Sequence, residues 1–226
     1  MSHEKARKIL PEAEFRPPAR KGDLLRLAAS QDVSMVGLVD GVFLQDYPPT
    51  PIEVCQLARR QGVLLAGAAS LGALRAVELE KFGMVGIGRV FELYKSGKLN
   101  ADDEVAVTFA DSSDGNFFRL QSEAMVDIRY NLFLAYKKGV VGKDTKKAIA
   151  RVAKGTYFPH RNYHDIIEAT RQKYSDISRL QQDIDAFQDY IEKNRVSLKE
   201  MDAIKLVEFF KARLYSERKE ENNTES

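Results

Sequence analysis

The sequence contains no tryptophan, a single cysteine and only three histidines among its 226 residues. With Cys55 alone, no internal disulfide can form, which agrees with a reducing compartment, and we therefore expect a cytoplasmic protein. No stretch approaches the roughly 18 consecutive apolar residues that a membrane-spanning helix needs. The first residues also lack the apolar segment of a secretory signal peptide. These absences exclude a disulfide-stapled domain and predict that no membrane is among the partners.

An excess of charge of one sign is also absent. Lysine and arginine number 35 and aspartate and glutamate 33, so the formal net charge is only +2. Nucleic-acid-binding domains concentrate basic charge, so we expect no nucleic acid among the partners. Hydrophobic residues make up 44% of the chain and charged residues 30%. This composition is typical of a soluble, folded protein with one large domain or two small ones.

The stretch from Gly62 to Leu79 is the most informative part of the chain. Val63 to Gly67 is a short apolar run that predicts a buried strand, and residues 71–79, rich in alanine and leucine, predict a helix. Ser70 stands between the two elements. Its neighbours give the pattern small-x-Ser-x-Gly, a relaxed form of the nucleophile elbow. A serine at this place is more often a helix cap than a nucleophile, and both interpretations stay open.

A second strand and helix precede this stretch. The apolar run 33–39 predicts a strand buried on both faces, as in a parallel sheet. Thr50, Pro51 and Glu53 give the signature of a capping box at a helix start. The order strand, helix, strand, helix predicts an α/β fold with a small, mostly parallel sheet flanked by helices. Asp40 follows the first strand, at the edge of the sheet where such folds place their ligands.

Several other polar groups and glycines have competing interpretations. The three glycines in residues 83–88 match neither a dinucleotide-binding loop nor a Walker loop, so we interpret them as a tight connection and expect no cofactor. Arg75 and Glu78 share a helix face, and an ordinary ion pair is the favoured reading. Asp102, Asp103 and Glu104 are three adjacent acids, which should be solvated unless a cation or metal neutralises them.

The character of the chain changes after residue 121. Residues 105–110 and 116–120 predict a hairpin around the turn 111–115. Beyond it the pattern is helical, with a long helix over 123–138 capped by Ser122 and further helices at about 144–153, 161–174, 177–193 and 198–218. We therefore predict an α/β core at 1–121 and an all-helical region at 122–226 that packs on the core or extends from it.

His160 and His164 lie four residues apart and could face one metal ion. Asp165 follows His164, but Pro159 and His160 lie at a predicted helix start, and the stretch 158–163, with its arginine and aromatic residues, could instead be a partner surface. We therefore expect no metal site.

Three blocks of the sequence resemble one family. They are residues 37–43, which contain Asp40, residues 67–79, which contain Ser70, Arg75 and Glu78, and residues 83–94 continued by 102–106. Together with residues 15–23 they resemble the core of the TfuA-like proteins, over roughly residues 10–130. Members of that family usually begin with a further strand, and the chain begins just after the matching place. Either that strand is missing, which would leave an unfilled position in the sheet, or the start is misassigned. The helical half has no counterpart in this resemblance.

The resemblance implies a role beside YcaO enzymes, which use ATP to activate a peptide amide for backbone thioamidation. One activity associated with the family is hydrolysis of a thiocarboxylated, ubiquitin-like sulfur carrier protein, which releases sulfide. The implied partners are a YcaO-type enzyme, the sulfur carrier and the peptide or protein substrate. The expected function is therefore that of a thioamidation accessory protein and a candidate thiocarboxylate hydrolase.

The family's site is carried onto six candidate residues: Ser70, Asp40, Arg75, Glu78, Asp103 and Glu104. Ser70 would be the nucleophile or would position water, with Asp40 or Glu78 as the base and the N–H groups after Ser70 as oxyanion donors. Arg75 would hold the carrier's carboxyl terminus by a forked contact. No histidine lies in the resembling region, which disfavours a Ser-His-Asp triad. The alternative is a non-catalytic adaptor that delivers peptide or carrier to YcaO, and a nucleotide-binding enzyme is a weaker third class.

Overall fold

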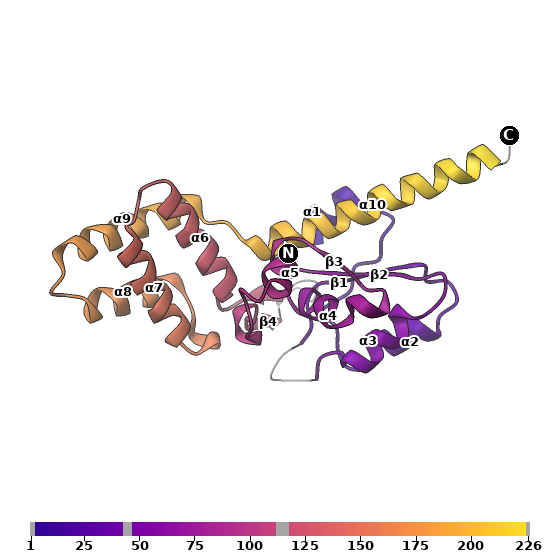
Figure 1. Cartoon of the computed structure of the whole chain (residues 1–226), viewed down its shortest axis with the longest axis horizontal. Coiled ribbons are helices and arrows are strands. Elements are labelled where there is room, and N and C mark those ends of the chain that lie inside the picture. The colour runs from indigo at the N-terminus through magenta and orange to yellow at the C-terminus, as the bar shows by residue number, and fades with distance from the viewer. Residues whose placement is uncertain (1–2, 43–46, 112–117, 225–226) are drawn as a thin grey trace. The chain divides into compact units, whose positions relative to one another are not determined.

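A computed structural model of the chain describes residues 3–42, 47–111 and 118–224 (Figure 1). Its contacts divide the chain into two compact units. The first, which we call the sheet unit, combines Met1–Asn100 with Lys199–Ser226. The second, which we call the helical unit, is Ala101–Leu198. No described helix has a segment long and apolar enough to cross a membrane.

The sheet unit is built on three parallel strands, which confirms the predicted α/β class. β1 (Met35–Leu38), β2 (Leu64–Ala68) and β3 (Val85–Ile87) lie side by side in that order. Leu38 is level with Gly67, and Gly67 is level with Gly86. All three strands therefore end at one edge of the sheet.

Helices cover both faces of this sheet. On one side lie α1 (His3–Ile9) and α10 (Leu198–Thr224), and on the other α2 (Asp23–Ala29), α3 (Pro51–Ala58) and α4 (Leu71–Leu79) (Figure 1). α5 (Arg89–Lys95) follows β3. Ala66 and Ala68 of β2 pack in one cluster with Leu206 and Phe210 of α10. Their small side chains allow α10 to lie close to the strands.

Two local expectations in this unit have different outcomes. The capping box is present, because the Thr50 hydroxyl accepts from the Glu53 N–H and the Glu53 carboxylate accepts from the Thr50 N–H. The interpretation of residues 83–88 as only a connection is wrong, because Val85–Ile87 form the third strand. A phenylalanine explains the central glycine: a Cβ on Gly86 would collide with the ring of Phe91.

The helical unit begins with short elements. A 3-10 turn covers Asp102–Glu104, and β4 (Phe109–Asp111) pairs antiparallel with β5 (Phe118–Leu120). This confirms the hairpin, whereas the strand predicted from residue 105 begins only at residue 109. The remaining positions of the predicted turn at 111–115, from residue 112 on, lie outside the described residues.

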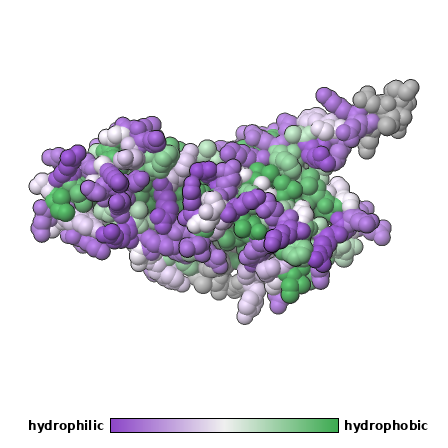
Figure 2. Space-filling view, in the orientation of Figure 1, coloured by the Kyte–Doolittle hydropathy of each residue, from purple (hydrophilic) through white to green (hydrophobic). Residues whose placement is uncertain are grey.

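Four helices complete the unit: α6 (Met125–Lys137), α7 (Lys143–Gly155), α8 (Tyr163–Lys173) and α9 (Ser178–Asn194). Each lies within a few residues of a predicted helix. Their apolar faces meet in one core that includes Ile128, Ile149, Ile166 and Phe187. Ser122 does not cap α6, because Ala124 is the cap residue and the Ser122 hydroxyl accepts from the Thr108 N–H. Hydrophilic residues dominate the visible face of α8 and α9, at the left of Figure 2.

The last helix belongs to the sheet unit from Lys199 onward. Its apolar stripe, including Leu206, Val207 and Phe210, packs with the sheet and α1. The compact units are thus not divided at residue 121. The predicted division into an α/β core at 1–121 and a helical region at 122–226 stays a prediction.

Candidate functional site

The carboxyl edge of the sheet gathers polar groups from three strands. Asp40 follows β1, Ser70 follows β2, and Gly88 and Arg89 follow β3. The N–H of Gly72 donates to the carbonyl oxygen of Val39 at 2.9 Å, so the segments that carry Asp40 and Ser70 are in direct contact. In open parallel sheets this edge is the usual place for a ligand.

Ser70 stands on a strained turn. Ala69 has φ +67°, and it is the only non-glycine residue with positive φ in the described part of the chain. The N–H of Ser70 donates to the carbonyl oxygen of Ala68 at 2.8 Å, which closes a three-residue turn of a rare, strained type. The Ser70 side chain does not cap α4. Strain of this kind is concentrated at functional sites, and the role of Ser70 as a nucleophile stays a prediction.

Two glycines make this turn possible. A Cβ on Gly67 would collide with the carbonyl oxygen of Gly72, and a Cβ on Gly72 would collide with that of Leu38. The start of α4 therefore lies directly against the ends of β1 and β2. Because the N–H groups of Gly72, Ala73 and Leu74 are bonded to Val39 and Ser70, the N–H of Leu71 is the first candidate donor to an oxyanion.

Asp40 is paired with a lysine from the last helix. Its Oδ1 lies 3.6 Å from Nζ of Lys199, and the Lys199 side chain is only 12% exposed. The main-chain oxygen of Asp40 accepts from the N–H of Ala19 at 2.9 Å. Asp40 is therefore held at the edge of the sheet by both its backbone and its side chain.

Asp202, on α10, is a second acidic residue at this edge and lies beside the end of β3. Its Oδ2 accepts from the Val90 N–H at 2.7 Å, and its Oδ1 has no hydrogen-bond partner among the described residues. Nζ of Lys205 lies 3.8 Å from Oδ1. Burial raises the pKa of the Asp202 carboxyl group, against the lowering effect of backbone hydrogen bonds from Val90 and Arg89. Gly88, with φ +94°, leaves the space that this side chain occupies.

Arg75 and Glu78 form the ion pair that their spacing favours. Nη1 of Arg75 donates to both carboxylate oxygens of Glu78, at 3.0 and 2.7 Å. Nε of Arg75 donates to the carbonyl oxygen of Pro49 at 3.2 Å, which ties the start of α3 to α4. The two side chains thus neutralise each other and support a loop, and their roles as base and anion clamp stay predictions.

Asp103 and Glu104 lie in the helical unit and are neutralised by cations. Glu104 makes a two-point contact with Arg129, at 2.8 and 2.9 Å, and also pairs with Lys154. Asp103 accepts from Lys154 and from the fully buried guanidinium of Arg161. Of the alternatives left open for these acids, the structure shows cationic partners in place of the default of solvation for these two residues.

The pKa values of these two carboxyl groups reflect this network. Burial raises the pKa of both Asp103 and Glu104. Hydrogen bonds from Lys154 and Arg161 to Asp103, and from Arg129 and Lys154 to Glu104, outweigh burial and leave each pKa below its ordinary value. Both groups are therefore held ionised, as expected of structural ion pairs.

The family model for TfuA-like protein matches residues 40–162, which is more than half of the chain. The chain belongs to the TfuA-like family. No curated protein matches it. The match runs past residue 130, through α6 and α7, so the expectation that the helical half lies outside the family's region is wrong for these helices. Four predicted site residues of this TfuA-like protein, including Asp40 and Ser70, lie in the sheet unit, and Asp103 and Glu104 lie in the helical unit.

Sequence reasoning missed Lys199 and Asp202. Both lie on α10, beyond the part of this TfuA-like protein that the family model matches. They are two polar positions on a helix with an ordinary apolar stripe, so no motif distinguishes them. Only the packing of α10 on the sheet places them beside Asp40 and Val90.

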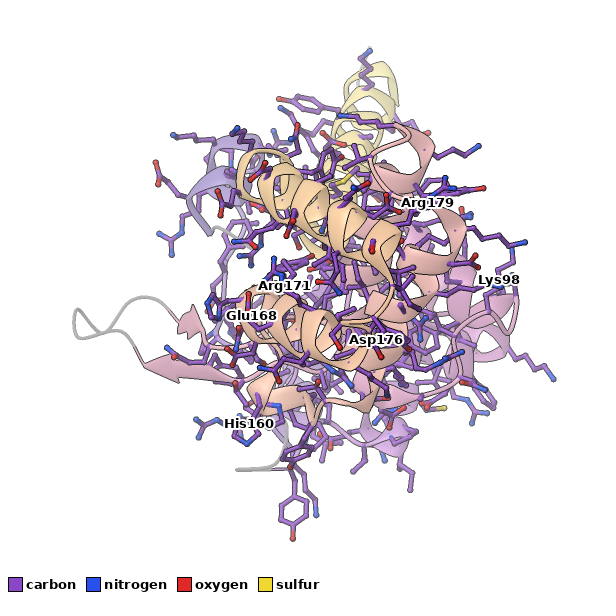
Figure 3. The ribbon with its side chains drawn as sticks, turned by 90° about the vertical axis from the view of Figure 1, so that its left-hand side faces the viewer. Lys98, His160, Glu168, Arg171, Asp176 and Arg179 are labelled. Carbon is purple, nitrogen blue, oxygen red and sulfur yellow. The ribbon has the colours of Figure 1, made fainter. Side chains whose placement is uncertain are left out.

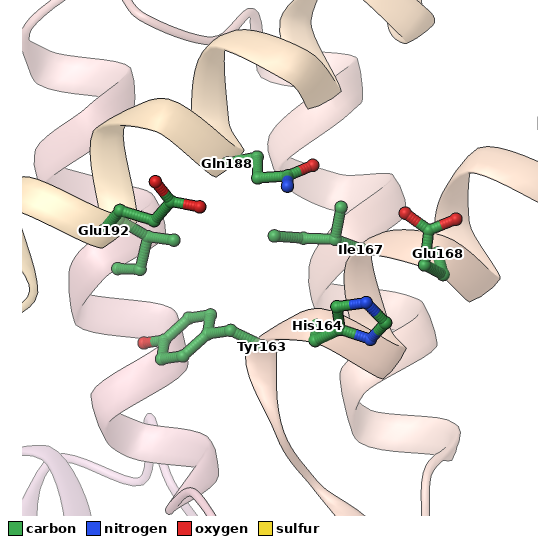
Figure 4. Close-up of a pocket in the computed structure, with 7 residues that line it drawn as sticks. Tyr163, His164, Ile167, Glu168, Gln188 and Glu192 are labelled. Atoms are coloured by element: carbon green, nitrogen blue, oxygen red, sulfur yellow. The ribbon is translucent and has the colours of Figure 1, made fainter.

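A small pocket lies between α8 and α9 in the helical unit (Figure 4). It has a volume of about 160 Å³, and its lining includes the apolar side chains of Ile167 and Ile191 and the carboxylates of Glu168 and Glu192. Arg171 is near Glu168 on α8 (Figure 3) and pairs with it. No described group of three or more histidine, cysteine, aspartate or glutamate side chains could hold a metal ion.

Proposed function

We propose that this protein hydrolyses a thiocarboxylated, ubiquitin-like sulfur carrier and passes the sulfide to a YcaO-type enzyme that thioamidates a peptide or protein. Water adds to the carbonyl carbon of the thiocarboxylate and the C–S bond breaks. The products are the carrier's carboxylate and hydrogen sulfide, so no oxidant or reductant is needed. Membership of the TfuA-like family supports the choice of this reaction.

The observation that carries the proposal is the strained turn that presents Ser70 at the carboxyl edge of the sheet. In this proposal the Ser70 hydroxyl attacks the carbonyl carbon or positions the attacking water. Asp40, held in place by Lys199, accepts the proton. The N–H of Leu71, at the start of α4, stabilises the oxyanion. This assigns base catalysis to Asp40 alone, because Glu78 is already engaged by Arg75.

The test is sulfide release from the purified thiocarboxylated carrier. Ser70→Ala and Asp40→Asn should each lower the rate by about 100-fold or more, the loss typical of removing a positioned nucleophile or base. Ser96→Ala is the matched control, because within the described residues the Ser96 hydroxyl donates only to the Leu93 carbonyl at the end of α5. Full sulfide release by both site variants would exclude the catalytic proposal.

A non-catalytic adaptor is the second candidate. Five of the six predicted site side chains, those of Asp40, Arg75, Glu78, Asp103 and Glu104, are engaged in ion pairs. For an adaptor, Ser70→Ala and Asp40→Asn would leave thioamidation by YcaO unchanged. The same two variants therefore distinguish the candidates when sulfide release and thioamidation are measured side by side.

A further inference from the structure

The hairpin of α6 and α7 carries a concentration of positive charge. Residues 137–154 contain seven lysines and arginines and one acid, Asp144. The chain as a whole is balanced, with 35 basic and 33 acidic residues. The excess on this hairpin is therefore local, and it produces a positive potential on one part of the helical unit.

These cations share a surface with two exposed aromatic rings. Lys143, Lys146, Lys147 and Arg151 follow helical spacing along one side of α7. Phe133 and Tyr136 lie on α6 and are 44% and 39% exposed. Nζ of Lys146 lies 4.6 Å from the centre of the Tyr136 ring, which joins the two helices into one surface. We call these six residues the basic face.

The four cations of the basic face have no ion-pair partner among residues 3–42, 47–111 and 118–224. Neighbouring cations differ, because Arg129 and Lys154 are both neutralised by Glu104. Lys143, Lys147 and Arg151 are exposed. Uncompensated like charges repel one another, so an acidic partner would gain interaction energy by covering them.

The chemistry favours an acidic protein surface over nucleic acid. The exposed aromatic rings already carry ammonium groups, since Lys137 lies over Phe133 at 5.9 Å and Lys146 over Tyr136. Bases that stack on aromatic side chains need the face of the ring. Three of the four cations of the basic face are lysines, which act as point charges rather than as forks for phosphates or bases.

We propose that the basic face is the docking surface for an acidic face of the sulfur carrier protein. This inference rests on the proposed function, in which the carrier must associate and leave in every catalytic cycle. Lysine-rich surfaces suit such a cycle, because their charges accelerate association and the partner can still be released. A permanent subunit would instead require a larger apolar interface.

The test is binding of the purified, fluorescein-labelled carrier in its carboxylate form, followed by anisotropy at several salt concentrations. The variant is the triple substitution Lys143→Glu, Lys147→Glu and Arg151→Glu. The control triple is Lys173→Glu, Arg179→Glu and Lys193→Glu, which changes the same number of exposed charges elsewhere in the helical unit. Circular dichroism and a thermal melt establish that both variants fold.

We expect the first triple to weaken carrier binding by about tenfold or more and to reduce its salt dependence, while the control binds like the natural protein. Equal binding by both triples, or no binding by the natural protein at low salt, overturns the inference. The inference is also overturned if the natural protein binds a labelled 20-nucleotide RNA more tightly than the carrier and the first triple loses that RNA binding. Sulfide release is measured separately: its absence in the natural protein rejects the proposed function, whereas the binding result reports on docking alone.

Discussion

At the residue scale, the backbone conformation around Ser70 depends on a few small residues. Ala69 occupies a conformation that costs an L-residue roughly 1 kcal/mol or more. The turn lies where Gly67, Gly72 and Leu38 approach one another so closely that a Cβ on either glycine would collide with backbone. The strain is therefore maintained by packing, and this is how a serine between a strand and a helix comes to be presented differently from a cap.

Gly72 gives the sharpest prediction at this scale. Gly72→Ala should lower the free energy of unfolding by about 3 kcal/mol or more, because its Cβ would collide with the backbone of Leu38, which cannot rotate away. Gly155→Ala is the control, since a Cβ there meets no atom of the described residues within 4 Å. In that position at the end of α7 alanine should stabilise by about 0.5 kcal/mol. Urea denaturation measures both, and equal effects would contradict the close approach at Gly72.

At the scale of elements, the sequence predicts those that depend on local patterns. The capping box at Thr50 and the helices after residue 121 follow from side-chain chemistry and apolar spacing. β3 was missed because it is three residues long and has a glycine at its centre. Its pairing with β2 is a tertiary interaction that overrides local propensity. Ser122 failed as a cap for a similar reason, because the N–H of Thr108 uses its hydroxyl.

The candidate site follows the same division. Asp40 and Ser70 could be located because the ends of neighbouring parallel strands meet at one edge. Lys199 could not be located, because the apolar stripe of a helix does not indicate which surface the helix packs against. The ion pairs of Asp103 with Arg161 and of Glu104 with Arg129 join residues 58 and 25 positions apart. No local rule predicts such pairs.

The network around Glu104 predicts how the helical unit responds to acid. Although burial raises the pKa of Glu104 and Asp103, hydrogen bonds from Arg129, Lys154 and Arg161 bring both below their ordinary values. A carboxyl group whose pKa is lower in the folded state than in the unfolded state stabilises the folded protein. Its full contribution is present at pH values above the unfolded pKa. That stabilisation is lost as pH falls through the folded value. We therefore expect thermal stability to fall below about pH 4.

Glu104→Gln tests this assignment. At neutral pH it should cost about 2 kcal/mol, because Arg129 and Lys154 lose a charged acceptor that is 5% exposed. The acid-dependent loss of stability should be smaller than in the natural protein. Glu192→Gln, at an exposed position of α9, should leave both the melting temperature and its pH profile unchanged. A pH profile unaffected by Glu104→Gln would show that the network does not control acid stability.

At the scale of the whole molecule, the chain leaves the sheet unit after residue 100 and returns to it at Lys199. The sheet unit therefore depends on residues from both ends of the sequence. Ala203, Leu206, Val207 and Phe210 of α10 are buried against the cluster that contains Ala66 and Ala68 of β2. This arrangement makes α10 part of the core of the sheet unit, although it follows four helices of the other unit.

Truncation separates this role of α10 from that of the end of the helix. Ending the chain at residue 198 should destabilise or unfold the sheet unit, because burial of Leu206 and Phe210 alone contributes about 1.5–3 kcal/mol each and typical total stability is only about 5–15 kcal/mol. Ending it at Ser216 keeps every buried α10 residue of that cluster and should change the melting temperature little. Thermal melts and limited proteolysis compare the two proteins with the full chain. If the protein ending at residue 198 melted like the full chain, α10 could not be part of the core.

If it unfolds as expected, a loss of YcaO binding after deletion of everything beyond residue 140 would reflect unfolding as well as a missing contact surface. A test of the adaptor role should therefore use surface substitutions in the helical unit that leave α10 in place.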